Sequence, residues 1–181
     1  MLQLPVTSAS LFVLVRPHYP ENVGAVARAM KVMGLTQLSL VKPSRIAVPE
    51  HEMARKMAVK STDVLLAAER FDTLEEALTG CSWAFATTSR RGVSGVVTPR
   101  QAAARAALAA AQGQRVAFVF GNEKTGLSAE DRARCAEAIR IPIAGDQPSL
   151  NLAQAAQILA YELFMSGLEQ RSAAPPVDEA P

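Results

Sequence analysis

Short, mainly apolar runs alternate along the chain with longer stretches in which apolar residues recur every three or four positions. A run of four or five mainly apolar residues predicts a strand buried on both faces, as strands of a parallel sheet are. Such runs occupy residues 11–15, 38–41, 83–87, 116–120 and 139–143, the last of them interrupted by Pro142.

Apolar spacing of three and four predicts amphipathic helices. This spacing is found in residues 23–34, 99–111, 128–137 and 150–168, and in two or three short pieces between residues 50 and 79. Asn22 and Ser128 are expected to cap the helices that follow them, and Pro99 suits a first helical turn. Because strands alternate with helices, we expect an α/β fold with a mostly parallel sheet and helices on both faces.

Composition narrows the class of protein. The 181 residues are 49% hydrophobic, enough for one domain with a sizeable core, and the net charge of +2 permits an anionic partner without requiring one. The two cysteines form no C-x-x-C pair, and we find neither a signal peptide nor a membrane-spanning run. We therefore expect a reduced, cytoplasmic protein with no membrane contact. The proline-rich, acidic residues 171–181 are expected to be a tail or a linker to an absent carboxyl-terminal region, after a domain of residues 1–170.

Three clusters carry side chains capable of chemistry. They are N-V-G-A-V-A-R (22–28), F-G-N-E-K-T-G-L (120–127), and I-P-I with S-L-N-L (141–143 and 149–152). Each also has a plain structural explanation when taken singly. Arg28, which projects off the apolar stripe of its helix, could be a solvated surface residue. The glycines could form an ordinary β-to-α turn, and Ser149 or Asn151 could simply cap the last helix.

Several well-known signatures are absent from the sequence. A P-loop places lysine and then serine or threonine directly after its second glycine, whereas Leu127 and Ser128 follow Gly126 here. A Rossmann fingerprint needs a third glycine. The stretch H-E-M-A-R at residues 51–55 lacks the second histidine of a zinc-protease helix, and the chain has no G-x-S-x-G sequence. We therefore expect neither a metal site nor a Ser-His-Asp apparatus.

Taken together and in this order, the three clusters resemble the three motifs of the SPOUT methyltransferases over about residues 11–168. The chain is most similar to their TrmH-type branch, which methylates the 2′-hydroxyl of ribose in RNA. Within it, P-E-N-V-G-A-V-A-R-A-M-K-V-M-G-L and T-T-S-R are nearest to enzymes that modify cytidine or uridine 32 in the tRNA anticodon loop. The resemblance implies a deep trefoil knot at the carboxyl end and S-adenosylmethionine as cofactor. It also implies tRNA as substrate and a homodimer with its active site at the subunit interface.

The resemblance further implies roles for individual residues. The residues expected to be catalytic are Arg28, Glu123, Asn151 and Asn22. The residues expected to contact the cofactor are Thr88, Ser89, Arg90, Gly121, Ile141, Ser149 and Leu150. Such chains read T-S-A-R where this one reads T-S-R-R, so Arg90 and Arg91 are both candidates for the family's arginine. Both follow a predicted strand and should lie at the carboxyl edge of the sheet, where α/β proteins bind ligands.

Arg28 of one subunit is expected to face the cofactor of the other. The family account makes this arginine a general base, but a guanidinium has a pKa above ~12 and keeps its proton in proteins. We therefore expect Arg28 to orient the 2′-hydroxyl and to stabilise negative charge developing on its oxygen. Glu123 would position Arg28 or the ribose, with Asn151 in support. The alternatives are a 2′-O-methyltransferase for another RNA, such as ribosomal RNA, and a non-catalytic RNA-binding dimer of the same fold.

Overall fold

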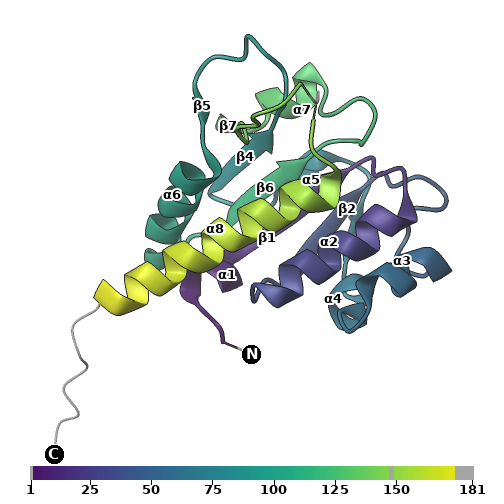
Figure 1. Ribbon diagram of the computed structural model, residues 1–181, viewed down its shortest axis with the longest axis horizontal. Helices are drawn as coiled ribbons and strands as arrows, with labels where there is room; N and C mark the ends of the chain where they lie inside the picture. The colour runs from purple at the N-terminus through teal and green to yellow at the C-terminus, as the bar shows by residue number, and fades with distance from the viewer. Residues whose placement is uncertain (1, 147–148, 174–181) are drawn as a thin grey trace, which may run out of the picture.

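In the described part of the chain, seven strands form one sheet in the order β3-β2-β1-β6-β4-β7-β5, and all six neighbouring pairs are parallel. The structure, a computed structural model, describes residues 2–146 and 149–173 (Figure 1). The strands are β1 (Ser10–Val15), β2 (Gln37–Val41), β3 (Glu69–Phe71), β4 (Trp83–Thr87), β5 (Val96–Val97), β6 (Val116–Phe120) and β7 (Glu137–Ile139). The predicted mostly parallel sheet is confirmed.

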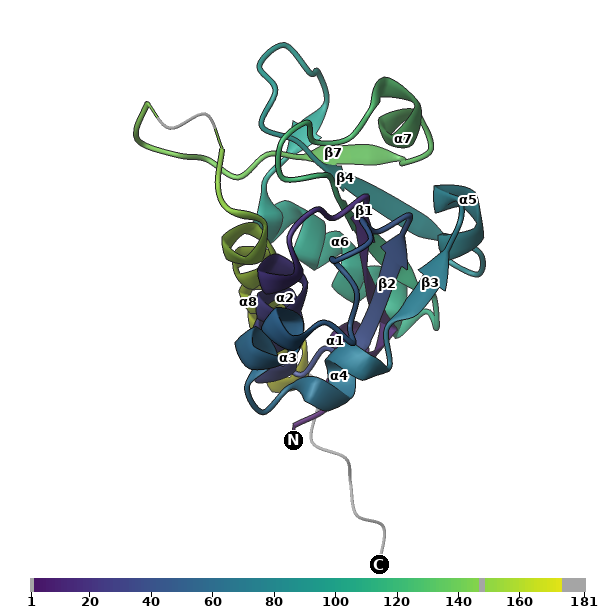
Figure 2. The same ribbon diagram turned by 90° about the vertical axis from the view of Figure 1, so that its right-hand side faces the viewer.

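Helices cover both faces of this sheet, as predicted. They are α1 (Pro5–Ala9), α2 (Pro20–Val32), α3 (Glu52–Ala58), α4 (Thr62–Leu66), α5 (Leu74–Ala77), α6 (Pro99–Ala111), α7 (Ala129–Ala133) and α8 (Leu152–Ala173). Figure 2 shows α2, α3 and α8 on one side of the sheet and α5 on the other. The coverage is unequal, because the long helices α2, α6 and α8 all pack into the same core.

The residues of β1 alternate between two hydrophobic cores. Phe12 and Leu14 pack into the core shared with α2, α6 and α8, whereas Leu11 and Val13 pack into the core shared with α5. The Phe12 ring lies 5.8 Å from the ring of Phe118 on the neighbouring strand, measured between centroids. Because both faces are covered, β1 is buried along its whole length, which is why its sequence reads as a continuous apolar run.

Two strands have no signal in the sequence pattern. The segment 50–79, predicted as helical pieces, contains α3, α4 and α5 but also β3, which lies at the edge of the sheet. The side chains of β3 are exposed or half-buried, so it has no apolar run. Strand β5 at the opposite edge is only two residues long.

The predicted bounds of the helix after Ser128 and of the last strand are wrong. The predicted helix 128–137 ends at Ala133, although Ser128 does cap it by accepting a hydrogen bond from the Asp131 backbone N–H. The predicted strand 139–143 overlaps β7 only at Ile139. Residues 140–143 leave the sheet, and their apolar side chains line a cavity instead.

The last helix begins later and ends later than predicted. Helix α8 starts at Leu152, and the Asn151 side chain caps it by accepting a hydrogen bond from the backbone N–H of Ala153 at 2.8 Å. Asn151 is therefore a helix cap, as one of the sequence interpretations predicted, although its amide nitrogen has a second contact described below. The helix continues to Ala173, and residues 174–181 of the predicted tail lie outside the described residues.

Strand β7 comes late in the chain but lies inside the sheet, between β4 and β5. The backbone N–H of Thr88 donates to Ile139 on one side, and that of Arg140 donates to Val97 on the other. The Arg140 side chain also donates to the Arg90 carbonyl in the loop joining β4 to β5, at 2.5 Å. The late segment therefore lies between two earlier strands and contacts the loop that connects them; the trefoil knot stays a prediction.

Gly24 allows α2 and α3 to approach each other closely. A Cβ atom placed on Gly24 would lie only 2.0 Å from the backbone oxygen of Ala54 in α3. The glycine of the N-x-G-x-x-x-R motif therefore has a packing function in this chain.

Replacing Gly24 with alanine is expected to destabilise the fold. The new methyl group meets backbone, which cannot rotate away, so α2 and α3 must separate. We expect a loss of about 3 kcal/mol, or roughly 6–12 °C in the unfolding temperature, measured by thermal denaturation. At Gly145 an added Cβ meets no atom within 4 Å, so Gly145→Ala is the control. An unchanged unfolding temperature for Gly24→Ala would show that α2 and α3 can separate at little cost in stability.

Candidate functional site

Four segments that follow strand ends meet at the carboxyl edge of the sheet. They follow β1, β4, β6 and β7, which are parallel and adjacent to one another in the sheet (Figure 1). In open α/β sheets this edge is where ligands bind. The edge carries all three clusters singled out in the sequence.

The larger of two cavities at this edge has a volume of about 770 Å³. Its lining comes from residues 87–91, 120–127, 132, 139–143, 145–146, 149–150, 152 and 155. The predicted cofactor residues that line it are Thr88, Ser89, Arg90, Gly121, Ile141, Ser149 and Leu150. Segments more than 50 residues apart in the chain thus converge on one cavity, although their roles stay predictions.

The turn after β6 forms one wall of this cavity. Asn122 organises it: its side-chain oxygen accepts hydrogen bonds from the backbone N–H groups of Lys124, at 2.8 Å, and Thr125, at 3.2 Å. Its backbone oxygen accepts from Gly126 at 2.8 Å. A Cβ atom on Gly121 would lie 2.3 Å from the backbone of Gly126, so the turn closes this tightly only with glycine there.

Next to the same turn, an ion pair joins the end of β1 to α7. The Asn122 side chain donates to the Arg16 carbonyl at 2.6 Å, and the Arg16 guanidinium pairs with the buried carboxylate of Asp131 in α7. Burial alone would raise the pKa of Asp131. Hydrogen bonds from Arg16 and Ser128 outweigh it, so the pKa lies below its usual range. The carboxylate therefore stays charged near neutral pH and holds α7 against the end of β1.

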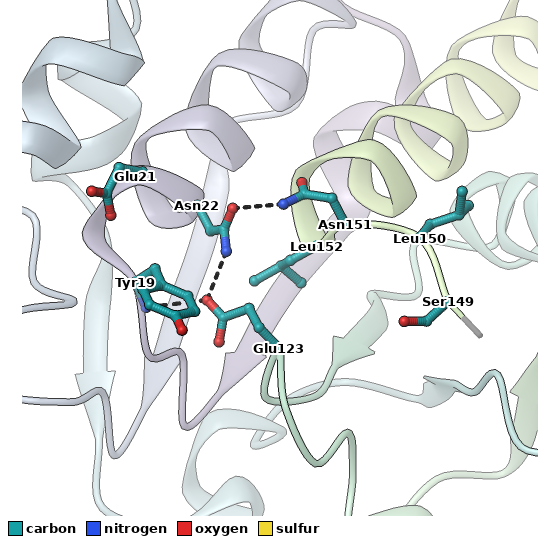
Figure 3. A pocket seen from close by; sticks show the side chains of 8 residues that line it. All are labelled: Tyr19, Glu21, Asn22, Glu123, Ser149, Leu150, Asn151 and Leu152. Atoms are coloured by element: carbon teal, nitrogen blue, oxygen red, sulfur yellow. Dashed lines mark hydrogen bonds between the residues drawn. The ribbon is translucent and has the colours of Figure 1, made fainter. Parts of the chain in front are cut away.

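The smaller cavity, of about 470 Å³, adjoins the larger one and contains a chain of polar contacts (Figure 3). Glu123 accepts hydrogen bonds from the backbone N–H of His18, at 2.8 Å, and from the Asn22 side chain, at 3.0 Å. The Asn22 oxygen accepts from the Asn151 side chain at 2.9 Å. One residue from each of the three clusters is thus joined directly to the next.

Asn22 is not the cap of α2, contrary to the sequence prediction. The helix begins earlier, at Pro20, with Tyr19 in the cap position. Proline suits the first helical position because its missing N–H would have no partner there. Asn22 therefore lies in the first turn, where its side chain is free to contact Glu123 and Asn151.

Arg28 does not line either cavity, unlike the other three predicted catalytic residues. It is exposed on α2, pointing off the apolar stripe as predicted. A single chain therefore does not bring Arg28 to the larger cavity. Arg90 and Arg91 both line that cavity and both are exposed, so the geometry does not choose between them.

Sequence reasoning missed several residues at this edge. Tyr19 lines the smaller cavity, Lys124 and Arg132 line the larger one, and His18 lies next to Tyr19. Lys124 falls within a quoted motif, but its side chain was given no role. Tyr19 and Arg132 belong to no apolar periodicity, so no signal in the sequence would have selected them.

Within residues 2–146 and 149–173, no three histidine, cysteine, aspartate or glutamate side chains gather as a metal site would require. In the same part of the chain, none of the helices has the length and apolar character needed to cross a membrane.

These features define an α/β protein with a ligand cavity at the carboxyl edge of its sheet and a second, polar cavity beside it. The family described as the SpoU rRNA Methylase family matches residues 9–161, and the chain belongs to this family.

Individual relatives are similar over most of the chain. The tRNA (cytidine/uridine-2′-O-)-methyltransferase TrmJ of Yersinia enterocolitica is 40% identical over 174 residues, which cover 93% of this chain and 66% of the relative. The chain thus spans slightly less than two thirds of that relative's length.

Solved structures agree with the family. The crystal structure of TrmJ from Z. mobilis matches with a TM-score of 0.79 and 38% identity, covering 87% of this chain and 69% of that one. The crystal structure of an AdoMet-bound rRNA methyltransferase from Sinorhizobium meliloti matches with a TM-score of 0.68, covering 96% of this chain and 60% of that one. At 22% identity, the second match shows a shared fold only.

Proposed function

We propose that this chain transfers a methyl group from S-adenosylmethionine to a ribose 2′-hydroxyl of tRNA, at cytidine or uridine 32 of the anticodon loop. It would do so as a homodimer whose active sites lie at the subunit interface, with a knotted carboxyl end. Residues up to about 170 would form the catalytic domain. Membership of the family and the TrmJ relatives support the reaction and the substrate.

The larger cavity fits the proposed cofactor. Its volume of about 770 Å³ lies within the range of about 300–1,000 Å³ typical of small-molecule sites. Apolar side chains, among them Phe120, Ile139 and Ile141, offer contact for an adenine ring. The hydroxyl groups of Thr88 and Ser89 and the backbone of the Gly121 turn offer hydrogen bonds. The same cavity contains no phosphate-binding loop, and a nucleoside without phosphates needs none.

One observation carries the proposal: the two cavities adjoin each other. Glu123, Ser149, Leu150 and Leu152 line both. Group transfer requires donor and acceptor in contact, with the reacting atoms about 3–3.5 Å apart. A ligand in the larger cavity therefore borders a space in which a second substrate can lie.

The residues of this chain would position the acceptor, while the bound cofactor supplies the electrophilic methyl group. Glu123 holds Asn22 and the backbone before α2, which fixes the start of the helix that carries Arg28. Arg28 of the other subunit would orient the 2′-hydroxyl and stabilise the negative charge developing on its oxygen.

Two measurements test the proposal. Calorimetric titration with S-adenosylhomocysteine should show binding, and a non-catalytic dimer with a lapsed cofactor site should show no heat. Methylation of tRNA transcripts should then place the label on the ribose of nucleotide 32, mapped by mass spectrometry. Because the family description names rRNA, ribosomal RNA is the comparison substrate. Faster methylation of rRNA than of every tRNA would overturn the substrate class while leaving the reaction intact.

A further inference from the structure

Tyr19 presents an exposed aromatic ring at the smaller cavity. The residue is 40% exposed, although it lies directly between the buried strand β1 and the buried start of α2. It lines the smaller cavity together with Glu123 and Asn151, and Figure 3 shows its ring beside the Glu123 carboxylate. An aromatic side chain left uncovered at a cavity is available for stacking.

The backbone and the neighbours of Tyr19 hold this ring in place. The backbone is extended, with φ −107° and ψ 127°, as expected before proline, and its N–H donates to Glu123 at 3.2 Å. The His18 ring packs edge-on against Tyr19 at 4.7 Å between centroids. The Lys124 ammonium lies over one face of the Tyr19 ring, 5.4 Å from its centroid, so the opposite face is the one on which a base would stack. The ring is therefore positioned before any ligand arrives, which lowers the entropic cost of stacking on it.

Most polar atoms of the smaller cavity are already engaged with one another. Both Glu123 oxygens accept hydrogen bonds, and so do the side-chain oxygens of Asn22 and Asn151. Figure 3 shows the Glu21 carboxylate turned away from this chain of contacts. Among the described residues, Glu21 is the exception: it lines the same cavity, and one of its carboxylate oxygens is buried without a hydrogen-bond partner.

We propose that Tyr19 is the stacking platform for the base of the target nucleotide, which is held in the smaller cavity by its flat face. This inference rests on the proposed function, because it assigns the smaller cavity to the RNA substrate. Unpaired RNA bases are commonly bound by stacking on aromatic side chains. Stacking tolerates any base, since every base has a π-face. Cytidine and uridine at the target position are therefore accepted about equally.

Substitution of Tyr19 tests the platform directly. Tyr19→Leu keeps an apolar side chain but removes the ring, so kcat/KM for tRNA falls about 5- to 100-fold, mainly through KM. Tyr19→Phe keeps the ring and retains activity within about threefold of wild type. The matched control is Tyr161→Leu, because Tyr161 is 47% exposed on α8 and lines neither cavity. S-adenosylhomocysteine affinity, measured by calorimetry, stays unchanged in all three variants.

A second measurement does not depend on activity. A tRNA carrying 5-iodouridine at the target position is irradiated in complex with the S-adenosylhomocysteine-bound protein. The crosslink should map to Tyr19 in the wild type and disappear in Tyr19→Leu. A crosslink elsewhere, equal kcat/KM for Tyr19→Leu and wild type, or more than tenfold preference between cytidine and uridine would each overturn the platform. Failure of the wild type to methylate any RNA would instead overturn the proposed function.

Discussion

Replacing Arg28 with alanine is expected to lower methyl transfer by about 10²- to 10³-fold, while S-adenosylhomocysteine binds as it does to the wild type. The residues that line the proposed cofactor cavity are all unchanged in this variant, and Arg28 would approach that cavity from the other subunit to act on the 2′-hydroxyl, so the affinity for the cofactor product should be retained. What is lost is a preorganised positive group that stabilises the oxygen of the 2′-hydroxyl as negative charge develops on it. Single-turnover methylation of tRNA and calorimetry measure the two effects separately.

Two further variants sharpen this test. Arg28→Lys keeps the charge but loses the planar fork of the guanidinium, so we expect only partial recovery of the rate. Arg171→Ala removes an exposed arginine from the last turn of α8 and serves as the control. A wild-type rate for Arg28→Ala would exclude a catalytic role for this residue.

Replacing Gly121 with alanine is expected to weaken S-adenosylhomocysteine binding by roughly 5- to 150-fold, because a displaced turn leaves hydrogen-bonding groups unpaired at a cost of about 1–3 kcal/mol. The added Cβ would lie 2.3 Å from backbone atoms of Gly126 and Leu127, so the turn must open into the proposed cofactor cavity. Calorimetry measures the affinity, and circular dichroism verifies that the variant is folded. Gly24→Ala is the matched control, since its added methyl strains the contact between α2 and α3 and should leave the affinity of the folded protein within about threefold. Wild-type affinity for Gly121→Ala would mean that this turn does not contact the ligand.

Mixing the Arg28→Ala and Gly121→Ala variants, at a cofactor concentration too low to occupy the Gly121→Ala site, tests whether an active site is built from one subunit or from two. If Arg28 acts on the cofactor cavity of the partner, a mixed dimer has one complete site, built from the intact Gly121 of one chain and the intact Arg28 of the other. Random reassociation should then restore about a quarter of wild-type activity, since half of the dimers are mixed and each has one complete site. No recovery would place Arg28 and the cavity within one chain.

The centre of the sheet was predictable from sequence, and its edges were not. The bounds predicted for β4, α6 and β6 agree with the structure, because these elements are mainly apolar and have buried residues in the hydrophobic cores. The edge strands β3 and β5 have few buried side chains and therefore no apolar pattern. Ile141 was wrongly predicted to lie in a strand for a different reason: its apolar side chain lines a cavity. An apolar pattern indicates which residues are buried, but it does not indicate whether they are buried within the sheet or at a cavity.

The resemblance, and not composition or spacing, indicated most of the residues that line the two cavities; it did not indicate the contacts between them. Composition and spacing selected Asn22 as a helix cap, whereas its side chain connects Glu123 to Asn151 across more than 100 residues of sequence. Tyr19 gave no signal at all, because a single exposed aromatic residue belongs to no pattern. Contacts of this kind depend on how the strands are ordered in the sheet, and local sequence does not encode that order.

The interior position of β7 has a consequence for how the protein is made. Strand β5 pairs with β7, so it has no partner in the sheet until residues 137–139 have emerged from the ribosome. The proposed cofactor cavity also takes part of its wall from residues 139–155. Ligand affinity is thus acquired only after the residues up to Ala155 have been synthesised, and a truncated nascent chain ending before β7 should show none of it.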